Sequence, residues 1–369
     1  MKKRLSLILF LFISLLLVGC GKLSTGKIGV IRDEEFGNVY IDLTIDEFND
    51  LGFSFGDSVD VKFNNGKTYY DVPYYSGYYV QVGELLCCGY PGYPHVVIAR
   101  NYGDPTWEEF EMNEKSKVKI TLNEKGKYID TQELFSLDYF DDREKYESDI
   151  MFANFRVLNG GSIKENLVYR SASPCDNQHK RAPYANSLIA EYGIKFAINL
   201  SDNETKYLGY KEKDDFVSYY YDDLYKENNV LFLALNANYH AQGFAKAVSG
   251  ALYEMTKSPG PTIIHCVEGK DRTGFLCALV LALAKASASE IIDDYMITYY
   301  NYYSITKDSD PKKYEAILGN VYDFLYCMCE VEKGVNVDTL DLFEGAKNYL
   351  AFGGLTQGEI ARVIDYLTK

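Results

Sequence analysis

The chain has 369 residues, more than one ordinary domain holds, so its length predicts two domains. Hydrophobic residues make up 47% and charged residues 25%, a globular composition that argues against a fibrous or disordered chain. The net charge of −15 has the wrong sign for a nucleic-acid-binding protein. It also disfavours long-range attraction to anionic lipids, although it leaves room for a local basic patch.

Residues 1–19 have the pattern of a secretory signal peptide. Three basic residues precede an apolar stretch over 5–18, which is too short to span a bilayer as a helix. The stretch ends in Leu17-Val18-Gly19-Cys20, which resembles the lipobox of bacterial lipoproteins. The resemblance implies cleavage before Cys20 and lipid attachment to its thiol. Residues 20–30 would then be a lipidated tether, and the protein would be extracytoplasmic and anchored to the bacterial cell membrane.

Residues 31–136 are predicted to form a smaller all-β accessory domain, either a barrel or a sandwich. Short β-branched or aromatic runs are separated by Gly, Asn, Asp and Pro, and they predict strands over 39–44, 58–63, 68–75, 95–100 and 117–122. Residues 64–66 and 123–126 have the composition of hairpin turns. The run Phe36-Gly37-Asn38-Val39-Tyr40 resembles the C-terminal β domain of the S-adenosylmethionine hydroxide adenosyltransferase family, which implies a fold and no activity. An unrelated β domain is the alternative.

Residues 137–149 are charged and non-periodic, which predicts a linker. From 150 to 369 helical and strand patterns alternate, which predicts an α/β domain with a central sheet flanked by helices. The expected helices are 184–192, 239–257 and 274–285, and the expected strands are 194–200 and 262–265. Capping boxes at Ser287 and Thr356 and a proline at Pro311 predict three further helix starts. The helix over 274–285 is apolar on every side, which places it at the centre of its domain.

The segment His265-Cys266-Val267-Glu268-Gly269-Lys270-Asp271-Arg272-Thr273-Gly274 joins the predicted strand 262–265 to this central helix. Such a junction directs backbone N–H groups and the positive helix end at one point, which forms an anion site. A cysteine that begins the loop ionises readily beside a helix N-terminus and cations. Arg272 can reach back over the loop, and its planar guanidinium matches two phosphoryl oxygens. The segment predicts phosphoryl transfer through a cysteinyl-phosphate.

The segment also resembles the signature loop of protein tyrosine phosphatases. Its Lys-Asp-Arg-Thr-Gly ending looks most like the bacterial branch that acts on phosphotyrosine, phosphoserine/threonine and phosphoinositides. Three further motifs extend the resemblance over 150–369: Asn154-Phe155-Arg156, Val168-Tyr169-Arg170-Ser171-Ala172 and Ile291-Ile292-Asp293-Asp294-Tyr295. The resemblance implies that Cys266 is the nucleophile, that Arg272 clamps the phosphate and that His265 orients the loop.

The remaining loop residues are expected to bind the phosphate: Val267, Glu268, Gly269, Lys270, Thr273 and Gly274. Gly269 allows a tight turn, and Thr273 can donate its hydroxyl to the thiolate or cap the helix. Lys270 is either a second cation that suits doubly phosphorylated ligands or a solvated loop lysine, while Glu268 adds negative charge to the rim. No metal or cofactor is expected, because the loop and Arg272 supply the electrostatic stabilisation.

The general acid is open between two carboxyl groups. Members of the bacterial branch carry Asp-Leu-Arg-Ser after the preceding strand, where this chain has Asn199-Leu200-Ser201-Asp202. Asp271, inside the loop, is the first candidate and Asp202 the second. The altered motif also supports an alternative, a catalytically weak surface lipoprotein that binds phosphate or phosphopeptides. A rhodanese-like sulfurtransferase would use a loop cysteine too, but it does not explain Arg272-Thr273-Gly274.

Cys175 and Arg181 repeat the spacing of Cys266 and Arg272. Their segment has no glycine and no strand before it, so we interpret it as structural or as part of the site rim. Six cysteines have no pairing that the sequence decides: Cys87, Cys88, Cys175, Cys277, Cys327 and Cys329.

Overall fold

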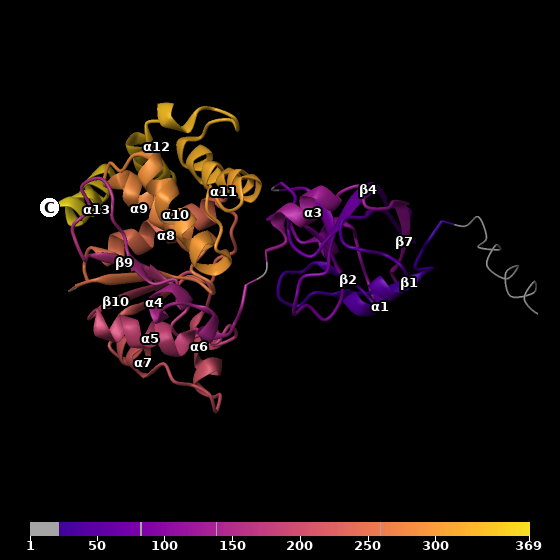
Figure 1. Cartoon of the computed structure of the whole chain (residues 1–369), viewed down its shortest axis with the longest axis horizontal. Helices are drawn as coiled ribbons and strands as arrows, with labels where there is room; N and C mark the ends of the chain where they lie inside the picture. Colours follow the sequence, from indigo (N-terminus) through magenta and orange to yellow (C-terminus); the bar gives the residue numbers. More distant parts are fainter. Residues whose placement is uncertain (1–21, 82, 138, 259) are drawn as a thin grey trace, which may run out of the picture. The chain divides into compact units, whose positions relative to one another are not determined.

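The computed structural model describes residues 22–369 with the exception of 82, 138 and 259 (Figure 1). The predicted signal peptide 1–19 and the lipidation site Cys20 lie outside the described residues. The chain divides into two compact units that meet between Ser136 and Leu137. Within the described residues, no helix is both long and apolar enough to cross a membrane.

The first unit contains a closed barrel whose described strands follow the order β1-β2-β6-β5-β4-β3-β7. Their bounds are β1 (Ile28–Arg32), β2 (Val39–Ile41), β3 (Ser58–Phe63), β4 (Thr68–Tyr75), β5 (Leu85–Cys88), β6 (Val97–Arg100) and β7 (Lys117–Glu124). The pairing of β4 with β5 is parallel, and the other neighbouring strands pair antiparallel. The predicted turn at 64–66 is confirmed: it joins β3 to β4, and Gly66 has a φ of 96°.

Three expectations for this unit were wrong. Residues 28–30, expected to lie in the tether, belong to strand β1, because Ile28 and Val30 pack against the barrel core. The residues after β7 lead into a helix rather than a hairpin. The unit is also not purely β, since its described part includes the short helices α1 (Ile45–Asp50), α2 (Thr106–Glu109) and α3 (Ile129–Phe135). The strand over 85–88 was missed.

The second unit is built on a sheet with the order β11-β10-β12-β9-β8. The strands are β8 (Arg156–Val157), β9 (Val168–Ser171), β10 (Phe196–Asn199), β11 (Val230–Phe232) and β12 (Thr262–His265). The four strands from β11 to β9 run parallel, and β8 pairs antiparallel at the edge. Because β12 lies at the centre, the loop that follows it opens at the carboxyl edge of the sheet, where α/β proteins bind ligands.

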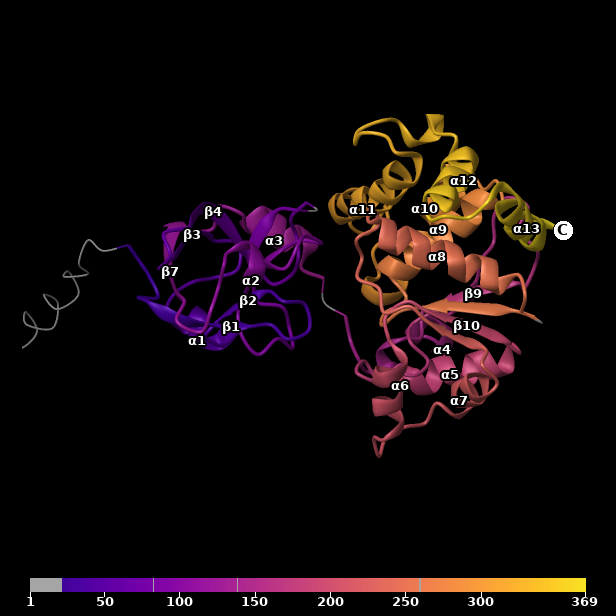
Figure 2. The ribbon, with the colours of Figure 1, turned by 180° about the vertical axis from the view of Figure 1, so that it is seen from behind.

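Helices cover both faces of this sheet, as the two opposite views show (Figures 1 and 2). One face carries α5 (Ala182–Glu191), α6 (Glu204–Lys211) and α7 (Tyr219–Lys226). The other carries α8 (Gln242–Met255), α9 (Asp271–Leu283), α10 (Ala288–Tyr303), α11 (Pro311–Cys329), α12 (Leu342–Phe352) and α13 (Gln357–Thr368). The helix α9 is buried along almost its whole length, which confirms the prediction that it is central. Both predicted capping boxes and the helix start at Pro311 are present.

The segment 137–149, interpreted from sequence as a linker, packs on the second unit. It contains the 3-10 turn η1 (Arg143–Lys145) and the first residue of α4 (Asp149–Phe152), and a second short 3-10 turn, η2 (Val337–Thr339), lies later in the chain. The Arg181 guanidinium donates to Asp141 at 2.8 Å and lies 4.9 Å from the centre of the Tyr139 ring. This charged segment therefore supplies side chains that contact the buried Arg181 and does not form a solvated linker.

Candidate active site

The loop 266–270 connects the end of β12 to the start of α9 and contains the predicted nucleophile. Cys266 is only 3% exposed, at the bottom of the loop. The backbone N–H groups of Val267, Glu268, Gly269 and Lys270 donate to no acceptor among the described residues. These groups and the positive end of a 13-residue helix make a cradle that suits a tetrahedral oxyanion.

Gly269 makes this loop possible by allowing two backbone segments to come close together. Its φ is +66°, and a Cβ atom at this position would lie 2.1 Å from the carbonyl oxygen of Ser171. Any larger residue would force the loop away from β9. The sequence-based expectation that this glycine serves a tight turn is therefore confirmed.

A buried ion triad holds the back of the loop. The Arg170 guanidinium donates to the carbonyl oxygen of Gly269 at 2.8 Å, and the Asn154 amide donates to the same oxygen at 3.1 Å. Arg170 Nη1 lies 2.5 Å from Asp294 Oδ2, and Arg156 Nε lies 2.9 Å from Asp294 Oδ1. Burial alone would raise the pKa of Asp294, but the two guanidinium groups hold it below its usual range.

A second buried network surrounds His265 and includes Asp202. His265 Nε2 and the Tyr221 hydroxyl share a hydrogen bond of 2.9 Å, and burial lowers the pKa of His265 to about 4. The Asn199 amide donates to both the Tyr221 hydroxyl and Asp202 Oδ2. Asp202 is fully buried, and its other oxygen accepts from the Tyr210 hydroxyl. Its carboxylate is occupied as an acceptor, so the geometry favours a positioning role over that of proton donor.

The first three residues of α9 have side chains with different surroundings. Asp271 is the first residue of α9, its side chain is 40% exposed, and it accepts from the Tyr295 hydroxyl at 3.2 Å. Arg272 Nη1 donates to the carbonyl oxygen of Leu235 at 3.0 Å. Thr273 makes no side-chain cap of α9, and its buried hydroxyl has no partner among the described residues.

Gly274 does not belong to the phosphate cradle, which corrects the expectation from sequence. Its N–H donates to the carbonyl oxygen of Lys270 in the first turn of α9. A Cβ atom here would lie 2.8 Å from the Tyr295 ring, so the glycine allows α10 to pack closely against α9.

Residues 152–369, more than half of the chain, match the tyrosine phosphatase family. The chain belongs to the tyrosine phosphatase family. The match covers both the loop 266–270 and the triad behind it, so the resemblance seen in the sequence is confirmed at the level of the family.

Two further similarities are shorter. A tyrosine-protein phosphatase of Nostoc commune is 40% identical over 53 residues, which is 14% of this chain and 18% of that protein. The chain thus spans about a fifth of the length of this curated relative. A crystal structure of an uncharacterized conserved protein from Thermotoga maritima is 28% identical and covers 26% of this chain and 35% of that one. Its TM-score is 0.23, which is too low to show a shared fold.

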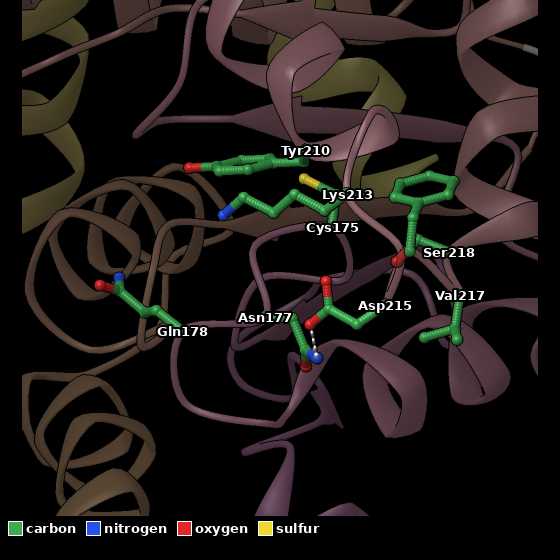
Figure 3. Close-up of a pocket in the computed structure, with 9 residues that line it drawn as sticks. Cys175, Asn177, Gln178, Tyr210, Lys213, Asp215, Val217 and Ser218 are labelled. Atoms are coloured by element: carbon green, nitrogen blue, oxygen red, sulfur yellow. Dashed lines mark hydrogen bonds between the residues drawn. The ribbon is translucent and has the colours of Figure 1, made fainter.

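Arg181, the arginine of the second Cys-x5-Arg segment, is structural. Its guanidinium carbon lies 4.7 Å from the centre of the Tyr302 ring, and its Nε donates to the carbonyl oxygen of Phe152. Cys175 is buried and lines a cavity of about 170 Å³ in the phosphatase unit (Figure 3). In this close-up the Asn177 amide donates to Asp215, while Lys213 extends beside the Tyr210 ring. The interpretation of this segment as structural or as rim is consistent with both positions.

The seven cysteines of the described part are free thiols. No cluster of three or more His, Cys, Asp or Glu side chains that could hold a metal ion is found among the described residues.

Several residues of the site were quoted in sequence motifs but received no role. Arg156, Arg170 and Asp294 form the triad. Tyr302, which no motif contained, donates its hydroxyl to the carbonyl oxygen of Glu268 at 2.7 Å. The signal for the triad was present, because two arginines and an aspartate occur in motifs typical of the family. Their contact could not be deduced, since more than 120 residues separate Arg170 from Asp294.

Proposed function

We propose that this phosphatase hydrolyses phosphate monoesters through a cysteinyl-phosphate on Cys266. The observation that carries the proposal is the row of backbone N–H groups, without an acceptor in the part of the chain that the structure describes, that begins beside Cys266 at the positive end of α9. Such a row favours the charge that develops on the transferred phosphoryl oxygens. Arg272 adds a planar cation, placed six residues after the nucleophile.

The reaction consists of two displacements at phosphorus. In the first, the Cys266 thiolate forms an S–P bond while the P–O bond to the leaving group breaks, and the leaving oxygen takes a proton from an acid. In the second, water attacks phosphorus, the S–P bond breaks and the thiolate is restored, while the acid regains a proton. The products are an alcohol or phenol and inorganic phosphate.

Asp271 is the residue we propose as that acid. Its side chain is 40% exposed at the first residue of α9, directly after the loop, whereas Asp202 is fully buried with its oxygens accepting hydrogen bonds. A proton donor must reach the leaving oxygen in a bound substrate, and general acid catalysis of this kind contributes typically ~10²–10⁴-fold. Accessibility therefore favours Asp271.

Hydrolysis of para-nitrophenyl phosphate by residues 21–369 tests the proposal. We expect turnover that disappears in Cys266→Ser. The matched control is Cys175→Ser, which removes the same atom from the segment with the same spacing and should keep turnover within severalfold. Activity that survives Cys266→Ser would refute the proposal, and phosphate binding without turnover would favour the phosphate-binding alternative. A panel of phosphotyrosine peptides, phosphoserine/threonine peptides and phosphoinositides would then name the substrate.

We further propose that the protein is a lipoprotein, anchored through Cys20 outside the cytoplasm of a bacterium. The lipobox-like Leu17-Val18-Gly19-Cys20 and the preceding apolar stretch support this proposal. Labelling of cells with a fatty-acid probe should mark the full chain and should not mark Cys20→Ser. Equal labelling of both would refute lipidation at this residue.

A further inference from the structure

Lys270 is the loop cation that the sequence offered to a second phosphate, but its charge is already paired with a carboxylate of the same loop. Its ammonium lies 3.2 Å from Glu268 Oε2 and 3.9 Å from Asp271 Oδ2. The side chain is 18% exposed and lies over the rings of Tyr299 and Tyr303, about 6 Å from each centre. Lys270 is thus folded onto the protein rather than extended into solvent.

Glu268 is in turn held in place by groups from other parts of the phosphatase unit. Its Oε1 accepts from the Tyr139 hydroxyl at 2.6 Å, and its backbone carbonyl accepts from the Tyr302 hydroxyl. Burial alone would raise the pKa of Glu268, but Lys270 and the Tyr139 hydroxyl hold it at about 2. The contacts with Lys270 and Tyr139 therefore favour the charged form of this carboxylate.

This arrangement opposes a second phosphate on the substrate. To bind Lys270, that phosphate would have to displace Glu268 from a charge-assisted contact and then lie beside its negative charge. A like charge left nearby disfavours the complex, and this is a common way for a protein to reject a wrong ligand. A single phosphate in the cradle needs no such displacement.

We propose that Glu268 is a specificity-determining residue: by neutralising Lys270 it makes the site favour substrates with one phosphate over substrates with a second phosphate on a neighbouring atom. This inference rests on the proposed function of the same site. It assigns Glu268 a side-chain role beyond the backbone cradle, and it assigns Tyr139 the role of positioning that side chain.

Two water-soluble short-chain lipids that differ by one neighbouring phosphate serve as probes, phosphatidylinositol 5-phosphate and phosphatidylinositol 4,5-bisphosphate. In the full chain, Glu268→Gln keeps an acceptor for Tyr139 and removes the charge that neutralises Lys270. We expect the ratio of kcat/KM for the bisphosphate to that for the monophosphate to rise about tenfold, the size of one good charge-assisted hydrogen bond. Tyr139→Phe should raise the same ratio by a smaller factor, about threefold.

Two further variants separate the proposal from a general charge effect. Glu268→Gln combined with Lys270→Met should lose the gain, because no cation is left to release. Glu191→Gln removes an exposed carboxylate at the end of α5. This helix ends before the amino end of β10, whereas the catalytic loop follows the carboxyl end of β12, so the variant should leave the ratio unchanged. An unchanged ratio in Glu268→Gln, or a gain that persists without Lys270, would overturn the proposal.

Binding measurements keep this test independent of turnover. In Cys266→Ser, the dissociation constants of both lipids can be measured with and without Glu268→Gln. If the phosphatase activity itself fails, the ratio of dissociation constants still reports the discrimination. If turnover is normal and both ratios stay the same, Glu268 has no part in specificity while the proposed function stands.

Discussion

Replacing Asp294 by asparagine should uncouple the catalytic loop from the sheet. Asp294 lies between Arg156 and Arg170, at 2.9 Å and 2.5 Å, and the three side chains are 9%, 11% and 0% exposed. Asp294→Asn keeps the shape but leaves two buried guanidinium groups without a counterion. Breaking a buried pair in this way costs about 3–5 kcal/mol of unfolding free energy. Because Arg170 also holds the carbonyl oxygen of Gly269, the loop should shift, and kcat/KM should fall by about 10²-fold for a displacement near 1 Å.

Urea unfolding and steady-state kinetics at 25 °C measure the two effects. The control is Asp293→Asn, which removes the adjacent, exposed carboxylate and should change unfolding by less than about 0.5 kcal/mol. Since the folded-state pKa of Asp294 lies below its ordinary value, the stabilisation is present above the ordinary pKa and is lost as the pH falls through the folded value. Asp294→Asn should lack this acid-side loss. A variant that is as stable and as active as Asp293→Asn would refute the reasoning.

Three other predictions concern the loop itself. Asp271→Asn should lower the turnover of alkyl phosphates by about 10²-fold or more. It should lower the turnover of an activated aryl phosphate far less, since a good leaving group needs no proton. Equal losses for both substrates would show that Asp271 is not the acid. Gly269→Ala should lower the free energy of unfolding by at least about 1–2 kcal/mol, because of the positive φ alone, and it should abolish turnover, because the new Cβ would meet Ser171. Thermal melting measures the first effect and kinetics the second. A fully active variant would contradict the close approach. The pKa of about 4 for His265 lies below the ordinary value near 6.5, so the unfolded chain takes up a proton at a higher pH than the folded chain does. The free energy of unfolding should therefore fall by on the order of 3 kcal/mol as the pH drops from about 6.5 to 4. His265→Gln should lack this contribution in urea titrations, and an unchanged pH dependence would contradict it.

The local parts of this site could be predicted from sequence, because each depends on a short run of residues. The strand β12, the buried helix α9 and the turn at Gly269 are specified by apolar runs and one glycine within a single segment. The neutralisation of Lys270 could not be predicted, since one of its determinants, Tyr139, comes from a charged stretch that resembled a linker. Asp202 was considered as an acid because it lies in the segment that corresponds to the Asp-Leu-Arg-Ser motif of the bacterial branch, whereas its burial became visible only in three dimensions.

The hydrogen bond between Tyr139 and Glu268 also links the catalytic loop to the first residues of the phosphatase unit. Tyr139 comes shortly after Ser136, where the first unit ends, and its hydroxyl contacts the catalytic loop directly. Tension along the chain at Leu137 would therefore reach Glu268 before any strand of the sheet. The contacts of Asp141 with Arg181 come next along the chain and would carry the rest of the load. The carboxylate that neutralises Lys270 is thus held by a residue near the start of the second unit, and a change in that segment would act on the rim of the catalytic loop.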